Sequence, residues 1–189
     1  YRFWWREEPP TGRAAAAVHD ALCRVISLVG FRGSGKTVVG KVLAARLGWN
    51  FIDMDEELSR RCGKPVAAIF AEEGEEAFRS RETELLRELL DGEKLVIATG
   101  GGVVLREENR RLLAEKSRVI WLHATAGEIL QRLPAPDPGR PPLTRLSWEE
   151  EVTKLLAERE PWYRQVASRE IASQGRTVEA VVEAIGRMR

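Results

Sequence analysis

Cysteine, aromatic residues and net charge are all scarce in this sequence of 189 residues. The two cysteines, Cys23 and Cys62, lie far apart and form no C-x-x-C pattern, which excludes a disulfide framework and a cysteine-based zinc site. This cysteine usage favours a reducing compartment, so we expect a cytoplasmic protein. Lys and Arg number 30 and Asp and Glu 29, and the resulting charge of +1 gives no general attraction to nucleic acid or to an anionic membrane.

Long apolar runs are also absent. No stretch approaches the roughly 20 apolar residues that span a bilayer. The first ten residues carry two arginines and two glutamates among aromatic side chains, unlike a secretory signal peptide. A composition that is 43% hydrophobic and 31% charged excludes collagen-like, low-complexity and wholly disordered classes. We expect one soluble domain, functioning as a monomer, in a chain long enough to bury a sizeable core.

Residues 1–23 differ in character from the rest and are interpreted as an N-terminal extension of a domain that spans residues 24–189. The extension contains Phe3, Trp4 and Trp5 and then a Pro9-Pro10 pair. Because aromatic side chains favour burial, we expect it to pack on the surface of the domain. A partner-binding arm is the alternative interpretation.

From Arg24 onwards the hydrophobic pattern alternates between short apolar runs and stretches of helical spacing. The runs predict strands at residues 25–29, 51–52, 95–98, 119–122 and 170–172. The helical spacing predicts helices at residues 36–47, 55–61, 75–90, 107–116, 126–133, 148–163 and 178–188. Alternating strands and helices indicate an α/β fold, an open parallel sheet covered by helices.

The strongest motif is Gly30-Phe31-Arg32-Gly33-Ser34-Gly35-Lys36-Thr37, which fits G-x-x-x-x-G-K-[ST]. It follows a predicted strand and opens a predicted helix, which is the context of a phosphate-binding P-loop. Its glycines let successive N–H groups turn inward around an anion at the helix N-terminus. Lys36 would reach the β and γ phosphates of a nucleoside triphosphate, and the Thr37 hydroxyl would hold Mg²⁺.

The motif does not by itself identify the phosphoryl acceptor. The guanine-reading N-K-x-D of GTPases does not occur in the sequence. Residues 134–142 contain five prolines and Arg140, which predicts a loop. In a small kinase such a loop would act as a lid over the phosphates and exclude water. We therefore favour a small-molecule kinase with a lid near residues 133–144.

Several charged residues and glycines outside the motif have both a functional and an ordinary structural interpretation. Asp53 and Asp55 follow the second strand, where a carboxylate can orient Mg²⁺ or accept a proton, or can simply cap a helix. The run Gly100-Gly101-Gly102 allows a ligand to approach the backbone, or forms a tight turn. Arg79 and Glu82 share a helix face, as an ion pair on the surface also would.

Two arginines late in the chain leave a similar choice open. Arg140 could clamp a transferring phosphoryl group or lie in solvent, and Arg164 follows Trp162-Tyr163 as an ordinary cation at a helix end would.

Taken in their order along the chain, these motifs resemble those of the shikimate kinase family, and the resemblance covers about residues 24–189. The resemblance rests on the P-loop, on Phe51 to Asp55, and on Ile69-Phe70 followed by Gly74 to Glu82. It continues through the triple glycine, Arg140-Pro141, and Arg159 to Arg164. It implies a P-loop NTPase-type three-layer fold with a five-stranded parallel sheet in the order 2-3-1-4-5. It also implies transfer of the ATP γ-phosphoryl group to the 3-hydroxyl of shikimate, in aromatic amino acid biosynthesis.

The resemblance assigns roles by motif match. Lys36, Asp55 and Arg140 would be catalytic, with Asp55 as the candidate base that also holds the ring hydroxyls. ATP would be bound by Gly33, Ser34, Gly35, Lys36, Thr37, Arg132, Arg140 and Arg176. Shikimate would be bound by Asp55, Phe70, Phe78, Arg79, Glu82, Gly100, Gly101, Gly102 and Arg164. Arg79 and Arg164 would hold its carboxylate, because a guanidinium fork matches that group. Thr37 and Asp53 would hold Mg²⁺.

The sequence departs from the family pattern in two places. Pro142 stands where the family usually has an apolar residue, which leaves lid contacts beyond Arg140 unassigned, and residues 1–23 have no counterpart. Two other functions remain open at this point. One is a different small P-loop kinase, acting on gluconate or a nucleoside monophosphate. The other is a catalytically silent nucleotide-binding module, although Lys36, Asp55 and Arg140 are all present.

Overall fold

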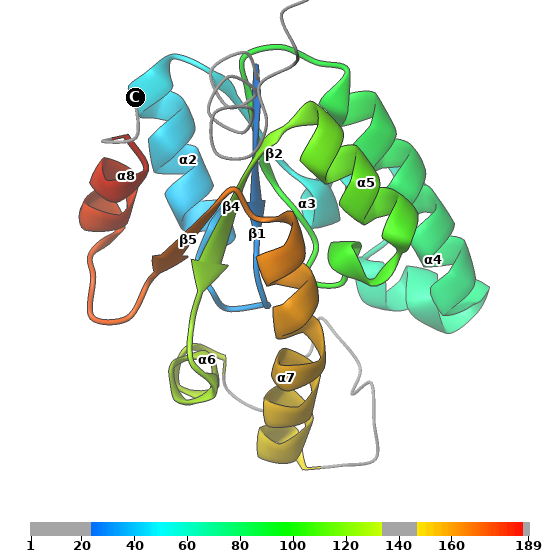
Figure 1. Ribbon diagram of the computed structural model, residues 1–189. Helices are drawn as coiled ribbons and strands as arrows, with labels where there is room; N and C mark the ends of the chain where they lie inside the picture. Colours follow the sequence, from blue (N-terminus) through cyan, green and yellow to red (C-terminus); the bar gives the residue numbers. More distant parts are fainter. Residues whose placement is uncertain (1–23, 134–146, 187–189) are drawn as a thin grey trace, which may run out of the picture.

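The computed structural model describes residues 24–133 and 147–186 and contains a five-stranded parallel sheet (Figure 1). The strands are β1 (Val25–Val29), β2 (Asn50–Asp53), β3 (Leu95–Ala98), β4 (Arg118–His123) and β5 (Arg169–Ala172). Their order is β2-β3-β1-β4-β5, and every neighbouring pair is parallel. The predicted fold class and strand order are therefore confirmed.

Helices cover both faces of the sheet, which gives three layers (Figure 1). One face packs against α2 (Lys36–Leu47) and α8 (Val178–Gly186), and Ile26 and Leu28 of β1 point into this layer. Val25 and Val29 point into the opposite layer. That layer contains α3 (Met54–Cys62), α4 (Val66–Leu90), α5 (Glu107–Lys116) and α7 (Trp148–Val166). Because β1 is covered on both faces, all five of its residues are buried.

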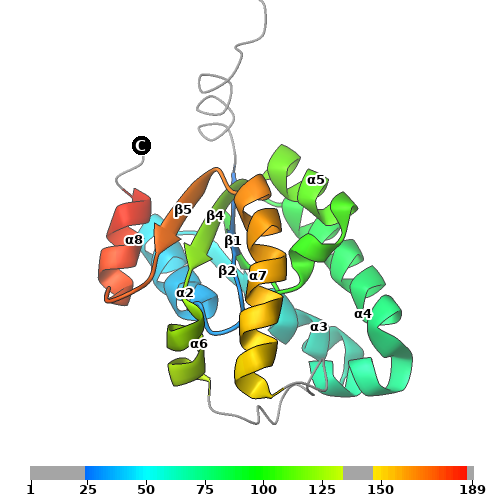
Figure 2. The same ribbon diagram turned by 60° about the horizontal axis from the view of Figure 1, so that its bottom comes forward.

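A third apolar cluster lies beyond the carboxyl ends of the strands. It joins Phe31 to Ile129 of α6 (Ala126–Arg132) and to Val152 and Leu155 of α7. Figure 2 shows α6 and the first turns of α7 on this side of the sheet. Both helices begin with a capping box, in which the Thr125 or Ser147 side chain accepts a backbone hydrogen bond and the glutamate three residues later reaches back.

The largest differences from the predicted helices lie in three places. Helix α4 begins at Val66, nine residues before the predicted start at Glu75. Gly74 has a non-helical φ of 84°, which kinks α4 immediately before that predicted start. Residues 103–105 form an unpredicted 3₁₀ turn, η1 (Val103–Leu105). Helix α7 ends at Val166, beyond the predicted end at Tyr163. The extension at residues 1–23 and the Pro-rich loop at residues 134–142 lie outside the described residues. No described helix is both long enough and apolar enough to cross a membrane.

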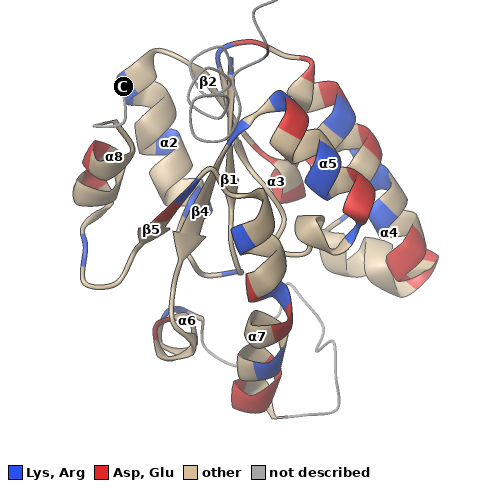
Figure 3. Ribbon diagram, viewed as in Figure 1, with Lys and Arg blue, Asp and Glu red and all other residues tan. Residues whose placement is uncertain are grey.

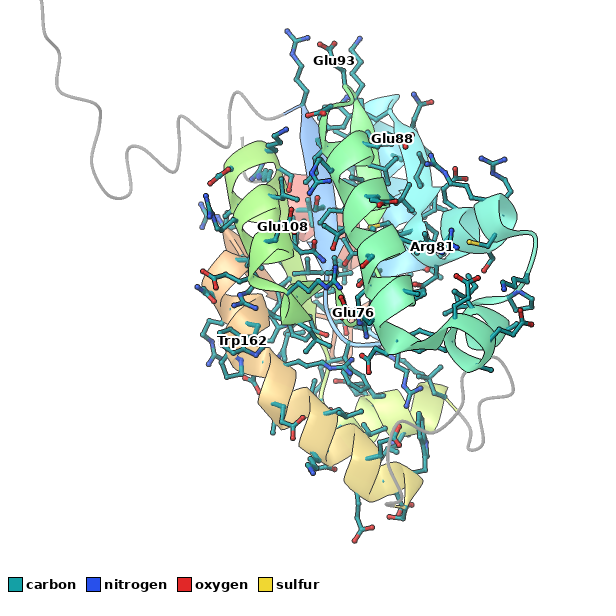
Figure 4. The ribbon with its side chains drawn as sticks, turned by 90° about the vertical axis from the view of Figure 1, so that its right-hand side faces the viewer. Glu76, Arg81, Glu88, Glu93, Glu108 and Trp162 are labelled. Carbon is teal, nitrogen blue, oxygen red and sulfur yellow. The ribbon has the colours of Figure 1, made fainter. Side chains whose placement is uncertain are left out.

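Ion pairs connect α3 to α4 on the outer surface. Both signs of charge are interspersed along α4 and α5 (Figure 3), and Glu88 lies on the outward side of α4 (Figure 4). Arg61 of α3 donates two hydrogen bonds of 2.7 Å to Glu88 and one of 2.7 Å to Glu57. Glu57 also accepts two bonds from Arg60, and these two arginines lower its pKa to about 2. Glu57 thus anchors the arginine that joins the two helices.

We expect Glu57→Gln to lower the free energy of unfolding at pH 7 by about 1 kcal/mol, the upper end for partly exposed ion pairs. The pKa of Glu57 is lower in the folded than in the unfolded state, so its contribution is complete above the unfolded value and is lost as pH falls toward 2. Urea unfolding between pH 7 and pH 3 should show the difference from wild type shrinking below about pH 4.5. Glu56→Gln, one residue away, is the control. A difference that is independent of pH would contradict the role of this carboxylate.

Candidate active site

The P-loop connects the carboxyl end of β1 to the first residue of α2. Gly33 and Gly35 have φ of 77° and 95°, in the left-handed region that glycine adopts without strain. Lys36 is buried, and its Nζ donates to the carbonyl oxygens of Gly30 (2.8 Å) and Phe31 (2.9 Å). The loop therefore curves around an ammonium group at the N-terminus of α2, where an anion is favoured.

A cavity opens over the P-loop, and we call it the cradle cavity. The residues from the sequence prediction that line it are Gly33, Gly35, Lys36, Thr37, Asp53, Asp55, Gly101 and Arg132. Ser34 is buried within the loop. Arg132 of α6 donates to the carbonyl oxygen of Gly33 (3.1 Å), which places a guanidinium at the rim of the loop.

Thr37 and Asp53 meet at the floor of the cradle cavity. The Thr37 hydroxyl donates to Asp53 Oδ2 over 2.6 Å. Asp53 Oδ1 also accepts the backbone N–H groups of Asp55 (3.0 Å) and Glu56 (3.3 Å) and so caps α3. The structural and functional interpretations of Asp53 are therefore compatible, because one oxygen caps the helix and the other faces Thr37.

A second cavity, which we call the arginine pocket, adjoins the first. Asp55, Arg32 and Gly101 line both cavities. The other residues lining the arginine pocket are Phe31, Phe70, Phe78, Arg79, Glu82, Gly100, Gly102, Leu155 and Arg159. Phe70 and Phe78 form one wall, with ring centroids 4.4 Å apart. A carboxylate thus stands where the phosphate-binding site opens into a pocket with apolar walls and charged groups.

Arg79 and Glu82 form a buried pair in this pocket rather than a surface pair. Arg79 Nη1 donates to Glu82 Oε2 over 2.8 Å, and the two side chains are 9% and 1% exposed. The pair with the exposed Glu75 is longer, at 3.3 Å. Burial raises the pKa of Glu82, and the Arg79 guanidinium opposes that rise. Glu82 Oε1 is buried without a hydrogen-bond partner among the described residues, so it is an acceptor that a ligand hydroxyl would satisfy.

The triple glycine is required by the close approach of these charged groups. A Cβ on Gly100 would lie 2.6 Å from Glu82 Oε1 and 3.0 Å from Asp55 Oδ1. A Cβ on Gly102 would lie 2.5 Å from both terminal nitrogens of Arg79. Cβ atoms essentially never make contacts under 3.0 Å, so a side chain at Gly100 or Gly102 would displace Glu82 Oε1 or the Arg79 guanidinium from its place in the pocket. The run is therefore part of the arginine pocket and not merely a turn after β3.

Besides Arg79, the pocket is lined by Arg159 and not by the predicted Arg164. Arg164 is exposed, pairs with Glu160 (2.9 Å) and does not line either cavity. Arg159 is 8% exposed, lines the pocket and donates to the carbonyl oxygen of Gly101 over 3.4 Å. Five residues correspond to about 500° along a helix, so the two arginines lie on faces about 140° apart. The spacing Glu151, Leu155, Arg159 is the sequence signal that could have identified the inward face.

Among the described residues, Arg176 is a further predicted arginine that lines neither cavity. Arg176 is exposed after β5, and its backbone N–H donates to the carbonyl oxygen of Ser173 (3.3 Å). Arg140 lies outside the described residues. The P-loop, the two aspartates, Arg79, Glu82 and the triple glycine are brought together as predicted.

A P-loop at the carboxyl ends of a parallel sheet, opening through one carboxylate into a pocket with buried charges, defines a small-molecule kinase of the P-loop class. The family model described as shikimate kinase matches residues 32–188. A shikimate kinase of Bordetella avium is 42% identical over 160 residues, covering 85% of this chain and 76% of the relative. One of Chromohalobacter salexigens is 44% identical over 160 residues, covering 85% and 88%. The chain belongs to the shikimate kinase family.

Solved structures agree with this assignment. A shikimate kinase from Acinetobacter baumannii, in complex with shikimate, is 36% identical with a TM-score of 0.84 and covers 92% of this chain and 96% of that one. One from Aquifex aeolicus is 32% identical with a TM-score of 0.76, covering 87% and 95%.

Tyr163 holds the glycine run in place from α7. Its buried hydroxyl donates to the carbonyl oxygen of Gly101, which also accepts from Arg159. Burial raises the pKa of Tyr163 well above its usual value. We expect Tyr163→Phe to lower the free energy of unfolding at pH 7 by about 1–2 kcal/mol, because a buried carbonyl loses a donor.

Repeating the unfolding measurement at alkaline pH tests whether loss of the Tyr163 hydroxyl causes the change in stability. In wild type the unfolded chain ionises Tyr163 near pH 10 while the folded chain does not, so stability falls above that pH. The Tyr163→Phe variant does not lose stability in this way. The difference in free energy of unfolding between wild type and the variant should therefore be smaller at about pH 11 than at pH 7, as measured by denaturant unfolding. An equal deficit at both pH values would contradict the assignment.

Proposed function

We propose that this chain transfers the γ-phosphoryl group of ATP to the 3-hydroxyl of shikimate. The observation that carries the proposal is the position of Asp55, at the junction between the cradle cavity and the arginine pocket. A phosphoryl group held by the P-loop and a hydroxyl held in the pocket would meet at this carboxylate. Membership of the shikimate kinase family supports shikimate as the acceptor.

The donor side would bind the triphosphate through Gly33, Ser34, Gly35, Lys36 and Thr37. The inward backbone N–H groups and Lys36 would neutralise the phosphate charges. Arg132 stands at the rim of the loop, where its guanidinium can stack on the adenine. Roles for Arg140 and the lid, and for Arg176 near the nucleotide, remain predictions.

Thr37 and Asp53 fit a Mg²⁺ site that is completed by phosphate oxygens and water. Their oxygens lie 2.6 Å apart and are hard ligands of the type that Mg²⁺ takes. The described residues contain no group of three or more acidic, histidine or cysteine side chains that could hold a metal alone. This suits Mg²⁺, which is usually bound by one or two protein ligands together with substrate phosphates. When bound, it would neutralise charge on the β and γ phosphates.

The acceptor side would hold shikimate through charges of both signs. Arg79 and Arg159 are the two buried guanidiniums of the pocket, and a carboxylate between them would receive charge-assisted hydrogen bonds. Glu82 orients Arg79 and offers its second oxygen to a ring hydroxyl. Phe70 and Phe78 would contact the apolar part of the ring.

Asp55 would hold the reacting hydroxyl and receive its proton. The hydroxyl oxygen bonds to the γ-phosphorus, the bond from that phosphorus to the β,γ-bridging oxygen breaks, and ADP leaves. The proton passes to the Asp55 carboxylate. Lys36 would stabilise negative charge on the transferring group. We further propose that the chain works in the cytoplasm as a monomer.

Release of ADP tests the proposed function directly. A coupled assay with Mg²⁺ and ATP should show turnover with shikimate and little without an acceptor. Gluconate and nucleoside monophosphates serve as competing acceptors. Turnover with one of these and none with shikimate would overturn the proposal, and no turnover with any acceptor would support a silent nucleotide-binding module.

The two arginines of α7 offer a matched test of the acceptor site. Arg159→Lys keeps the charge but loses the planar fork, so we expect the KM for shikimate to rise about ten-fold or more with little change in the KM for ATP. Arg164→Lys, on the exposed face, should change neither constant. The reverse ranking would place Arg164 in the site after all.

Variants of Asp55 and Asp53 should distinguish the role of a proton acceptor from the role of a Mg²⁺ ligand. Asp55→Asn removes the base and should lower kcat by at least about 10²-fold. Asp53→Asn should lose activity that a raised Mg²⁺ concentration partly restores, whereas Mg²⁺ should not rescue Asp55→Asn. If Asp55→Asn kept most of its kcat, Asp55 would be a substrate anchor without a role as base.

A further inference from the structure

A buried ion pair joins the P-loop to α7. Arg32 Nη2 and Glu151 Oε1 lie 2.9 Å apart, and the two side chains are 10% and 1% exposed. The Arg32 guanidinium also lies over the ring of Trp148, 4.3 Å from its centroid. Arg32 is one of the variable positions of the G-x-x-x-x-G-K-[ST] pattern, so the phosphate-binding mechanism of the motif does not account for this pair.

The position of the pair connects the two cavities. Arg32 lines both the cradle cavity and the arginine pocket. Glu151, Leu155 and Arg159 are spaced by four residues and share one face of α7, and the last two line the arginine pocket. One turn of the P-loop therefore contacts the same helix face that presents Arg159.

A second contact between the same two segments lies closer to the pocket. The Arg159 guanidinium is 5.5 Å from the ring centroid of Phe31, the neighbour of Arg32. Phe31 is buried in the apolar cluster formed with Val152 and Leu155 of α7. The apolar contacts hold α7 against the P-loop, but apolar contacts are non-directional. The ion pair adds a directional bond two turns before Arg159.

We infer that Arg32 and Glu151 are positioning residues that fix the rotation of α7 against the P-loop, and thereby place Arg159 for the acceptor. A buried ion pair contributes little net stability compared with apolar residues of similar size. In some proteins the role of such a pair is to select one arrangement of the groups that it joins. The inference rests on the proposed function, because it assigns Arg159 to the shikimate carboxylate.

Glu151→Gln is the first variant for the test, with Glu149→Gln as its matched control. Both changes remove one negative charge from the first turn of α7, but Glu149 is exposed. We expect Glu151→Gln to raise the KM for shikimate roughly ten- to hundred-fold, as a small misplacement of a binding group does. The KM for ATP should change less than about three-fold, since the P-loop backbone is retained. Glu149→Gln should match wild type in both.

A double variant separates positioning from simple stability. Arg32→Met/Glu151→Met removes both charges, so it leaves no buried charge unpaired and should unfold close to the wild-type temperature. Its KM for shikimate should nevertheless stay raised, because the directional bond is gone. Arg32→Lys, which keeps the charge, should restore part of the shikimate affinity lost in Arg32→Met.

The outcomes are distinguishable. A raised KM for shikimate in both Glu151→Gln and the folded double variant supports the inference. A wild-type KM in the double variant shows that the pair is merely structural and overturns it. A loss confined to kcat also overturns it, because Arg32 would then act on the phosphoryl group itself. If the wild-type chain does not phosphorylate shikimate at all, the proposed function fails first and takes this inference with it.

Discussion

The charged groups of the arginine pocket depend on backbone that carries no side chains. At residues 100–102 the chain turns away from β3 so closely beneath Glu82, Asp55 and Arg79 that added Cβ atoms would lie within about 3 Å of them. This proximity lets the buried Arg79 and Glu82 pair beside the half-buried Asp55. Burial of each charge alone would cost several kcal/mol, and pairing offsets that cost when the geometry is good. The glycine run therefore sets where the pocket lies and which charges it contains.

The same pocket is built from the sheet side and from one of the two helix layers. The segment after β3 supplies the glycines, α4 supplies the Arg79–Glu82 pair, and α7 supplies Arg159 together with the hydroxyl of Tyr163. The P-loop side chains Phe31 and Arg32 also contact α7: Phe31 packs in the apolar cluster with Val152 and Leu155, and Arg32 pairs with Glu151. Because each element meets the others at the carboxyl ends of parallel strands, a shift of one helix would change the site as a whole.

Much of this arrangement follows from local patterns. The P-loop motif, the alternation of strands and helices, and the grouping of Asp53, Asp55 and Gly100 at strand ends were predictable because each depends on nearby residues and on parallel topology. The choice between Arg159 and Arg164 required the inward face of α7. The four-residue spacing of Glu151, Leu155 and Arg159 indicates that face, but Pro161 and Trp162 obscure it near the end of the helix. The Arg32–Glu151 pair joins residues 119 positions apart, and no local pattern indicates such a contact. The first part of α4 was missed because Gly74 interrupts the periodicity.

The central position of β1 has a consequence for synthesis on the ribosome. Its neighbours are β3 and β4, so Val25 pairs with Leu95, about 70 residues later in the chain. At a translation rate of about 5–20 residues per second, β1 emerges roughly 4–14 s before its first partner exists. During that interval its apolar side chains are unburied and neither of its edges has a partner strand, which makes it a template for pairing with other chains. The strand that carries the P-loop in the folded protein is thus the segment that a nascent chain most needs to have shielded.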